Sequence, residues 1–432
     1  MTRHRISTLK DGTRIVTEAL DESVRSIALG LWIGAGSRDE RQTQAGLTHF
    51  LEHLIFRGSE RYSAQEVAEL FDTIGGELNA GTTREYTVLY ARILDEHLDL
   101  ALDVMTDLVH APSLNDLDAE RAVVLEEIAA AEDAPHELVH DMASIALYGD
   151  HPIGQPILGE SAVIAGTSRR AIKAFHRARY IPSNIVVAAA GSVDHDQLVR
   201  RVRRLTTAKA QPPPKHRARR RQYGRATAPR LVVGRKSTEQ VHFCATSFGV
   251  TSDDPRRYAV ALLDTLLGGS TSSRLFQEIR EKRGLAYAVY TYGVQYEDTG
   301  EFGVYVGTRE ENLELCCSVI AEQYDDLAAG GVTPSELQRA KDNLKGRIVL
   351  ALESTSSRMN RLGRSTIGGD EILDIDTVIQ EIEAVDGDEL TAVASKLLSS
   401  ERLAVAAIGP RVKPIRAAAK KLNSNIYVEE RR

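Results

Sequence analysis

The chain has few cysteines and no long apolar segment. Its three cysteines, Cys244, Cys316 and Cys317, are too few for a disulfide framework and lack CxxC spacing, so we expect buried thiols. No apolar run approaches the roughly 18 residues that a membrane-spanning helix needs, which argues against a membrane enzyme. The charged N-terminal residues are not followed by the apolar core of a secretory signal, and we therefore expect a cytoplasmic protein.

Signatures of several other protein classes are also missing. The chain has no GxxxxGK[ST] or GxGxxG segment to cradle a phosphate, and no GxSxG segment to present a serine nucleophile. Its formal net charge of -7 gives no reason to expect a nucleic-acid partner. One segment, 215–221 (KHRARRR), is strongly basic, and we interpret it as solvated linker.

The length and composition predict more than one domain. With 432 residues, of which 42% are hydrophobic, the chain exceeds what one hydrophobic core usually serves. The stretch from about 206 to 230 has few apolar residues and no periodicity, and three prolines lie at 212–214. We therefore expect an N-terminal catalytic domain at 1–210, a linker at 211–229 and a C-terminal homologous domain at 230–432.

The two halves share an order of predicted elements. Each opens with an apolar strand, at 24–36 and 240–250, and each closes with one, at 185–191 and 403–409. Between these strands we predict a helix, a strand pair and a long helix in both halves, which suggests a duplication. The elements lack a regular βαβ rhythm. We predict an α+β fold with two duplicated domains, each a mixed, largely antiparallel sheet covered by helices.

Local signals in the first half are clear. Ser63 and Glu66 make a capping box that begins a helix, and two glycines after residue 74 end it. The segment 77–93 is rich in Thr, Tyr and Val and is typical of a strand pair, and the segment 97–109 predicts another helix.

A metal-binding pattern follows the first predicted strand. The segment GLTHFLEHLIFRGS places His49, Glu52 and His53 within about 100° of arc on a helix. Two imidazoles one turn apart can bind one metal ion, for which zinc is the usual occupant. The carboxylate between them would lie beside a metal-bound water, where a general base is needed to take a proton and pass it to the leaving amine.

A third ligand is predicted on a downstream helix. In AERAVVLEEIAAAED, Glu120 and Glu127 lie seven positions apart, on one stripe with Val123 and Val124. Carboxylates on an apolar face must be paired or must bind a cation. Glu126 is better placed to face water.

Other interpretations of the histidines remain open at this point. A His pair at this spacing is often an ordinary feature of a surface or a core, and we assign His136 and His140 to packing or to a solvated helix face. The pair at 49 and 53 differs because Glu52 lies between its members and because a second helix carries an acidic stripe.

These residues resemble the pitrilysin-like metallopeptidases of the inverzincin type, in the branch of mitochondrial processing peptidase and its bacterial relatives. The resemblance covers essentially the whole chain. It implies that His49, His53 and Glu127 bind one zinc ion per chain, that Glu52 is the general base, and that Glu120 supports the site. It also implies that the two domains face each other around a chamber.

The resemblance adds residues from the second half. In SSRLFQEIREKRGLAYAVYTY it implies that Arg280 and Tyr287 approach the bound peptide. Both side chains are donors suited to a developing oxyanion or a peptide carbonyl. From the residues alone, Arg274 and Arg283 would serve equally well.

Substrate binding is expected in the segment LNAGTT. The resemblance implies that the strand at Asn79 and Ala80 pairs with an extended peptide as an added strand. The alternative is an ordinary strand with a turn at Gly81. Gly268 and Gly269 resemble a flexible loop near the chamber mouth, or they end a helix.

The function that we predict is a zinc-dependent endopeptidase that hydrolyses internal bonds of extended peptides or presequence-like segments. The alternative is a catalytically silent or partner-dependent peptide-binding subunit of the same family, although such subunits normally have a broken HxxEH. A noncatalytic zinc-stabilised domain fits less well, because structural zinc usually has four protein ligands, often thiolates.

The resemblance also implies a partner chain. The chamber of the family is built from four homologous domains, and this chain has two. We expect a homodimer, with a heterodimer with a silent relative as the alternative. The expected substrate is a peptide or an unfolded protein segment, with no nucleic acid and no membrane as partner.

Overall fold

The protein divides into two compact units, each built around one six-stranded sheet. The computed structural model describes residues 4–21, 23–207 and 230–431. Unit 1 comprises the described residues within 1–129, 156–221 and 350–374, and unit 2 comprises those within 130–155, 222–349 and 375–432.

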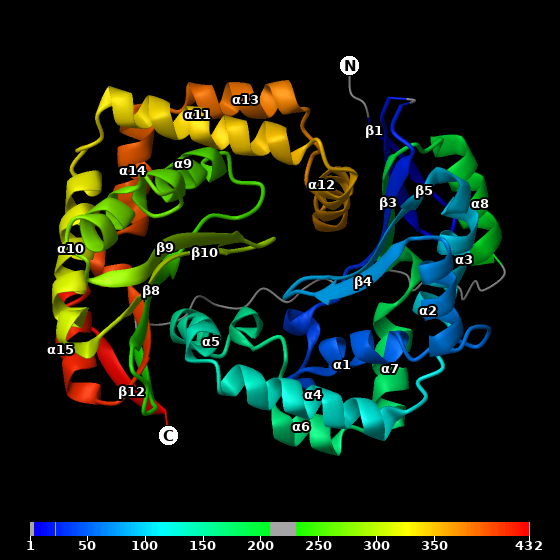
Figure 1. Cartoon of the computed structure of the whole chain (residues 1–432), viewed down its shortest axis with the longest axis horizontal. Helices are drawn as coiled ribbons and strands as arrows, with labels where there is room; N and C mark the ends of the chain where they lie inside the picture. Colours follow the sequence, from blue (N-terminus) through cyan, green and yellow to red (C-terminus); the bar gives the residue numbers. More distant parts are fainter. Residues whose placement is uncertain (1–3, 22, 208–229, 432) are drawn as a thin grey trace. The chain divides into compact units, whose positions relative to one another are not determined.

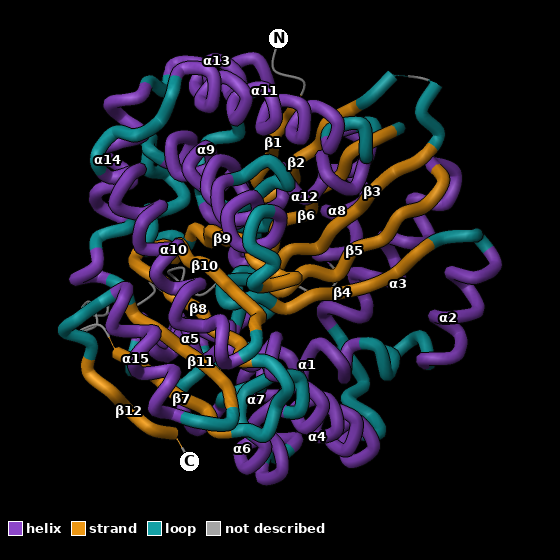
Figure 2. Tube along the Cα trace, turned by 60° about the vertical axis from the view of Figure 1, so that its left-hand side comes forward, coloured by secondary structure: helices purple, strands orange, loops and turns teal. Residues whose placement is uncertain are grey.

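The sheet of unit 1 has the strand order β1-β2-β6-β3-β5-β4. Only β2 and β6 are parallel neighbours; the other four pairs are antiparallel. Figure 2 shows β3, β5 and β4 side by side, with β4 at the edge. The strands are β1 (His4–Thr8), β2 (Arg14–Ala19), β3 (Ser26–Ile33), β4 (Glu77–Thr82), β5 (Thr87–Leu94) and β6 (Ile185–Gly191).

The sheet of unit 2 has the strand order β12-β7-β11-β8-β10-β9. Strand β7 is parallel to both of its neighbours, and the remaining three pairs are antiparallel. The strands are β7 (Arg230–Arg235), β8 (Val241–Phe248), β9 (Ala286–Gln295), β10 (Gly300–Thr308), β11 (Ala404–Gly409) and β12 (Tyr427–Arg431).

The two sheets repeat one another from their second strand to their last. Strands β2, β6, β3, β5 and β4 occupy the places that β7, β11, β8, β10 and β9 occupy in the other sheet. The outermost strands differ, because β1 is antiparallel to β2 whereas β12 is parallel to β7. The predicted fold class and the predicted duplication are thereby confirmed.

Helices cover both faces of the sheet in unit 1. Along β3, Leu29 and Leu31 face the larger core, whereas Ala28 and Trp32 face a smaller core on the other side, as the two-residue period of a strand requires. The helices of unit 1 are α1 (Leu47–Ile55), α2 (Ala64–Thr73), α3 (Leu98–His110), most of α4 (Leu117–Glu132), α6 (Ser161–Gly166), α7 (Arg169–Arg179), α8 (His195–Thr207) and α12 (Thr355–Gly368).

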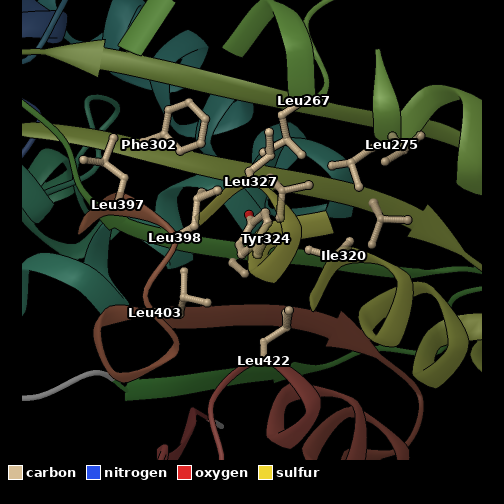
Figure 3. Close-up of a cluster of buried hydrophobic side chains, with 14 of the residues drawn as sticks. Leu267, Leu275, Phe302, Ile320, Tyr324, Leu327, Leu397, Leu398, Leu403 and Leu422 are labelled. Carbon is tan, nitrogen blue, oxygen red and sulfur yellow. The ribbon is translucent and has the colours of Figure 1, made fainter. Parts of the chain in front are cut away.

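Unit 2 has the same two-sided packing. Along β8, Phe243 and Ala245 face its larger core, and Cys244 faces a smaller one. Figure 3 shows part of the larger core, with Phe302, Tyr324 and Leu327 among leucines from several elements. The helices are α5 (Pro135–Tyr148), α9 (Arg257–Leu267), α10 (Glu310–Ala328), most of α11 (Pro334–Ala351), α13 (Ile375–Ala384), α14 (Gly387–Leu397) and α15 (Val412–Leu422).

Short helical turns connect these elements. They are η1 (Ser37–Asp39), η2 (Gln42–Gln44), η3 (Asp95–His97), η4 (Pro152–Gly154), η5 (Pro182–Asn184), the π-helical η6 (Phe276–Glu281) and η7 (Ser400–Arg402). Among the described residues, no helix is both long and apolar enough to span a bilayer.

Helix α12 covers the sheet of unit 1, although it lies in the second half of the sequence (Figure 1). Its Met359 sulfur accepts a hydrogen bond from Trp32 Nε1 at 3.4 Å. Its Arg358 and Arg361 bind Glu18, a carboxylate of β2 that is 2% exposed. A buried carboxylate needs such partners, so α12 and β2 depend on each other.

Helix α5 has the corresponding role in unit 2. It packs against β11 and β8. Its Ser144 hydroxyl donates to Glu301 Oε2 at 3.1 Å, and its Tyr148 hydroxyl donates to the carbonyl of Gly300 at 2.8 Å.

The compact units therefore differ from the expected domains. The expected division at 1–210 and 230–432 leaves each half of the chain in one domain, whereas the segments 130–155 and 350–374 each belong to the unit of the other half. Helix amphipathicity shows that a face is buried but not which sheet buries it. The expected linker at 211–229 lies outside the described residues.

Candidate metal centre

The His49, Glu52 and His53 side chains lie on α1. The apolar face of this helix, which includes Phe50 and Leu54, is fully buried in the core of unit 1. His49 is 7% exposed, and Glu52 and His53 are half-buried. The burial of one face fixes the rotation of the helix, so the three polar side chains of the motif share the other face.

The carboxylate of Glu40 binds backbone N–H groups at the start of α1. Glu40 Oε2 accepts a hydrogen bond from the Gly46 N–H at 2.8 Å, and Oε1 accepts one from the Thr48 N–H at 2.5 Å. Gly46 has φ 88°, and a Cβ there would lie 2.4 Å from the carbonyl oxygen of Leu158. Burial raises the pKa of Glu40 to about 7, against the opposing effect of these donors.

Helix α4 brings the third candidate ligand to this site. Its buried residues are Glu120, Val124 and Ile128, one per turn. Glu127, next to this stripe, has its Oε2 atom 3.3 Å from His53 Nε2 and 3.6 Å from His49 Nε2. Among the described residues, this is the only group of three or more metal-ligating side chains with donor atoms within 4.8 Å of one another, and Glu126 is not part of it.

The spacing of these donors fits a zinc ion. Ligand atoms about 2.0–2.1 Å from a tetrahedral zinc lie about 3.3–3.4 Å from one another. The distances of 3.3 and 3.6 Å between the Glu127 oxygen and the two imidazole nitrogens are close to this value. Two imidazoles and one carboxylate are also the donor set of a catalytic zinc site, which keeps a fourth position open.

Glu120 contacts His53 at Nδ1, the ring nitrogen that does not face Glu127. Glu120 Oε2 is 3.2 Å from His53 Nδ1, and Arg57 binds the second oxygen of the same carboxylate. A proton on Nδ1 would be shared with Glu120, which leaves the lone pair of Nε2 directed toward Glu127. Glu120 therefore acts through His53. Arg57 was not expected, although it lies one helical turn after His53.

The second imidazole has a different environment. Burial, and to a lesser degree the charge of His53, lowers the pKa of His49 to about 4, so this ring is neutral near pH 7. A neutral imidazole is the form that binds metal ions. Its Nδ1 atom is buried and has no hydrogen-bond partner within the described part of the chain.

Glu52 contacts the end of the edge strand. The Thr82 hydroxyl donates a hydrogen bond to Glu52 Oε2. Burial raises the pKa of Glu52 above its ordinary value, the Thr82 hydrogen bond and His53 oppose this, and Glu127 adds to it. A carboxylate with a raised pKa beside a metal site has the properties of a general base. Thr82 was not predicted as a site residue, because its only distinguishing feature in the sequence is its place in LNAGTT.

Comparison with known proteins identifies the family. The description "Insulinase (Peptidase family M16)" matches residues 14–161, which contain HxxEH and Glu127, and "Peptidase M16 inactive domain" matches residues 167–344.

The chain belongs to peptidase family M16. An "uncharacterized zinc protease" of Streptomyces coelicolor is 42% identical over 94% of this chain and 89% of its own length. A Bacillus subtilis protein, "uncharacterized zinc protease YmxG", is 38% identical over 93% of this chain and 97% of its own length. The predicted family is confirmed, and both of these relatives are named zinc proteases.

Solved M16-like structures share the fold. A protease from Helicobacter pylori superposes with a TM-score of 0.86 at 22% identity, covering 94% of this chain and 99% of its own. A Pseudomonas fluorescens structure titled as a peptidase M16 inactive domain superposes with a TM-score of 0.84, also at 22% identity.

The two M16-like halves differ in their metal-binding residues. The second half, 230–432, contains a single histidine, His242. It therefore has no counterpart of the pair His49 and His53.

Strand β4 lies at an edge of its sheet and carries Asn79 and Ala80. These residues pair with Tyr90 and Leu89 of β5 on one side only. The Ala80 N–H donates to the side-chain oxygen of Asn79 at 2.8 Å. An edge strand with backbone groups outside the sheet can accept a further strand, and here the Asn79 side chain would have to release the Ala80 N–H.

Arg280 and Tyr287 lie together in unit 2. The Arg280 guanidinium is 4.2 Å from the centre of the Tyr287 ring, and its Nη1 donates to the Tyr287 carbonyl at 3.1 Å. Tyr287 is 76% exposed. By contrast, Arg274 binds Glu336 and Asp326, so it is less available to a ligand.

Other residues considered in the sequence have structural contacts. Gly268 follows α9, and the N–H groups of Gly268 and Gly269 both bind the carbonyl of Asp264, as at a helix end. His140 on α5 lies 2.9 Å from the Tyr290 hydroxyl. Neither His136 nor His140 belongs to the metal-ligating group.

Proposed function

We propose that this M16 protein is a zinc-dependent endopeptidase that hydrolyses internal bonds of extended peptides or presequence-like segments. The observation that carries the proposal is the convergence of His49, His53 and Glu127, with Glu52 beside them and Thr82 fixing one of its oxygens. Three protein ligands with a neighbouring carboxylate suit hydrolysis better than structural metal binding.

In this proposal His49, His53 and Glu127 hold one zinc ion per chain. When bound, zinc would polarise the scissile carbonyl and lower the pKa of the attacking water. Glu52 takes the proton from that water and delivers it to the leaving amine. Glu120 holds His53 in the tautomer that presents Nε2.

Substrate recognition in this proposal uses backbone pairing. An extended peptide would add to β4 beside Asn79 and Ala80, which favours unfolded segments over folded proteins. Arg280 and Tyr287 would donate to the peptide or the developing oxyanion, a role that rests on the family resemblance.

The direct test is hydrolysis of an internally quenched peptide library. We expect the purified protein to cleave with zinc and not with phenanthroline, and we expect Glu52→Gln to bind zinc but lose at least about a hundredfold in kcat. Cleavage by Glu52→Gln at the wild-type rate would contradict the mechanism. Zinc binding without any cleavage would instead favour a peptide-binding subunit.

We also propose that two copies of the chain form the active species, since the family chamber needs four domains and each chain has two. A heterodimer with a silent relative is the alternative. Sedimentation of the purified protein should give twice the 47.4 kDa mass of one chain. A monomer that cleaves peptides at full rate would contradict this assembly.

A further inference from the structure

Thr82 links the two parts of the site that the proposed function uses. It is the last residue of β4, the edge strand, and its hydroxyl donates to Glu52 on α1. Leu78 and Ala80 pack against the core of unit 1. Because alternate residues of a strand share a face, Thr82 lies on that same face, whereas Asn79 and Gly81 lie on the opposite one.

The backbone at Thr82 is fixed on both sides. Thr82 forms the last pair of the β4–β5 hairpin with Thr87. The next residue, Thr83, closes the turn: its N–H donates to the Tyr86 carbonyl at 2.8 Å, and its carbonyl accepts from the Ser37 N–H at 3.1 Å. The Thr82 hydroxyl therefore starts from a rigid position, and the Glu52 side chain, with its three rotatable bonds, is the mobile partner.

One hydrogen bond of this kind selects one orientation of a carboxylate. The hydroxyl binds Oε2, so Oε1 is the oxygen that remains for a water molecule. A general base must lie within about 2.6–3.2 Å of the proton that it takes, and a freely rotating carboxylate would meet that condition only part of the time.

We propose that Thr82 is a positioning residue that orients the Glu52 carboxylate. It would also hold this carboxylate at a fixed position relative to a peptide strand added to β4. This inference rests on the proposed function, in which Glu52 is the base and β4 binds substrate. Because the donor is part of the substrate-binding strand, a shift of β4 displaces the base as well. The arrangement favours substrates that pair along β4 without distorting it.

The test compares Thr82→Val, which removes the hydroxyl at nearly constant shape, with Thr82→Ser, which keeps it. Thr8→Val is the matched control, since Thr8 is an exposed threonine on β1, at the other edge of the same sheet. We expect Thr82→Val to lower kcat about 10- to 100-fold, a part of what a general base contributes, with KM and the zinc Kd unchanged within about twofold. Thr82→Ser should keep at least about a third of wild-type kcat, and Thr8→Val all of it.

Crystal structures of the metal-free variants supply a second readout that does not need activity. The Glu52 carboxylate should leave its orientation in Thr82→Val and keep it in Thr82→Ser. An unchanged carboxylate in Thr82→Val, an unchanged kcat, or a kcat loss matched by weaker zinc binding would each overturn the inference. A wild-type protein that does not cleave, or that cleaves without Glu52, would instead refute the proposed function, and the crystal structures would still decide whether Thr82 orients Glu52.

Discussion

At the scale of single residues, the neighbouring carboxylates Glu126 and Glu127 differ in one respect that matters. Only Glu127 has an oxygen near both imidazoles. We expect Glu127→Ala to weaken zinc binding at least about a hundredfold, because a three-ligand site loses its only anionic ligand, and Glu126→Ala to change it less than about twofold. Competition with a chromophoric chelator measures both. Equal losses, or a larger loss in Glu126→Ala, would disprove the ligand assignment.

The candidate ligands were predictable because helical spacing places His49 and His53 one turn apart and because the family resemblance singles out Glu127, which on α4 lies beside the buried stripe rather than in it. Their supporting residues were not. Arg57, Thr82 and Glu40 reach the site through side chains whose partners lie on other elements. Sequence spacing describes one element at a time, so a contact between α1 and β4 leaves no local pattern.

At the scale of elements, the buried Glu40 makes the stability of α1 depend on pH. A carboxyl with an ordinary pKa of 4.5 in the unfolded chain and about 7 in the folded protein binds its proton more tightly when folded. Its contribution to stability is therefore full below about pH 4.5 and falls as the pH rises to 7. The lowered pKa of His49 acts in the opposite direction and is common to both proteins, so we expect the free energy of unfolding of the metal-free wild type to fall relative to that of Glu40→Gln between pH 5 and 7.5. Urea unfolding with a chelator present measures this, and parallel pH profiles would contradict it.

Helix α12 packs closely on Trp32. A Cβ at Gly363 would lie 2.1 Å from a ring atom of Trp32, whereas a Cβ at Gly346 on α11 would meet nothing within 4 Å. Gly363→Ala should destabilise the protein by about 1–3 kcal/mol through overpacking. Gly346→Ala, the matched control, should stabilise it by up to about 1 kcal/mol through helix propensity. Denaturant unfolding separates the two, and a neutral Gly363→Ala would show that the helix can move away.

Elements with strong local signals were predicted close to their observed bounds. The capping box of Ser63 and Glu66 begins α2 as expected, and the pair β4 and β5 occupies the predicted segment. The strands β1, β2, β7 and β12 were not among those predicted. Strand β1 (HRIST) has one large apolar residue, and β7 (RLVVGR) has three between its terminal arginines, so both apolar patterns are too short to identify alone.

At the scale of the whole molecule, each sheet depends on a helix from the other half of the chain. A fragment of residues 1–207 would lack α12, which leaves Trp32 uncovered and Glu18 without its two arginines. We expect this fragment to aggregate or to bind a hydrophobic dye, and we expect appending 350–374 and removing 130–155, whose α5 packs on the other sheet, to restore a monodisperse product. Cooperative unfolding of the shorter fragment as a monomer would contradict the dependence.

The exchange of α5 and α12 also bears on how a duplicated chain of this kind could arise. A single copy of the repeat would carry a helix that its own sheet does not bind, and one face of that sheet would stay uncovered. In two copies, the helix of each copy can pack on the open sheet face of the other, as in a domain-swapped dimer. Fusion into one polypeptide makes the swap intramolecular, so an association that separate copies must maintain by concentration becomes insensitive to dilution.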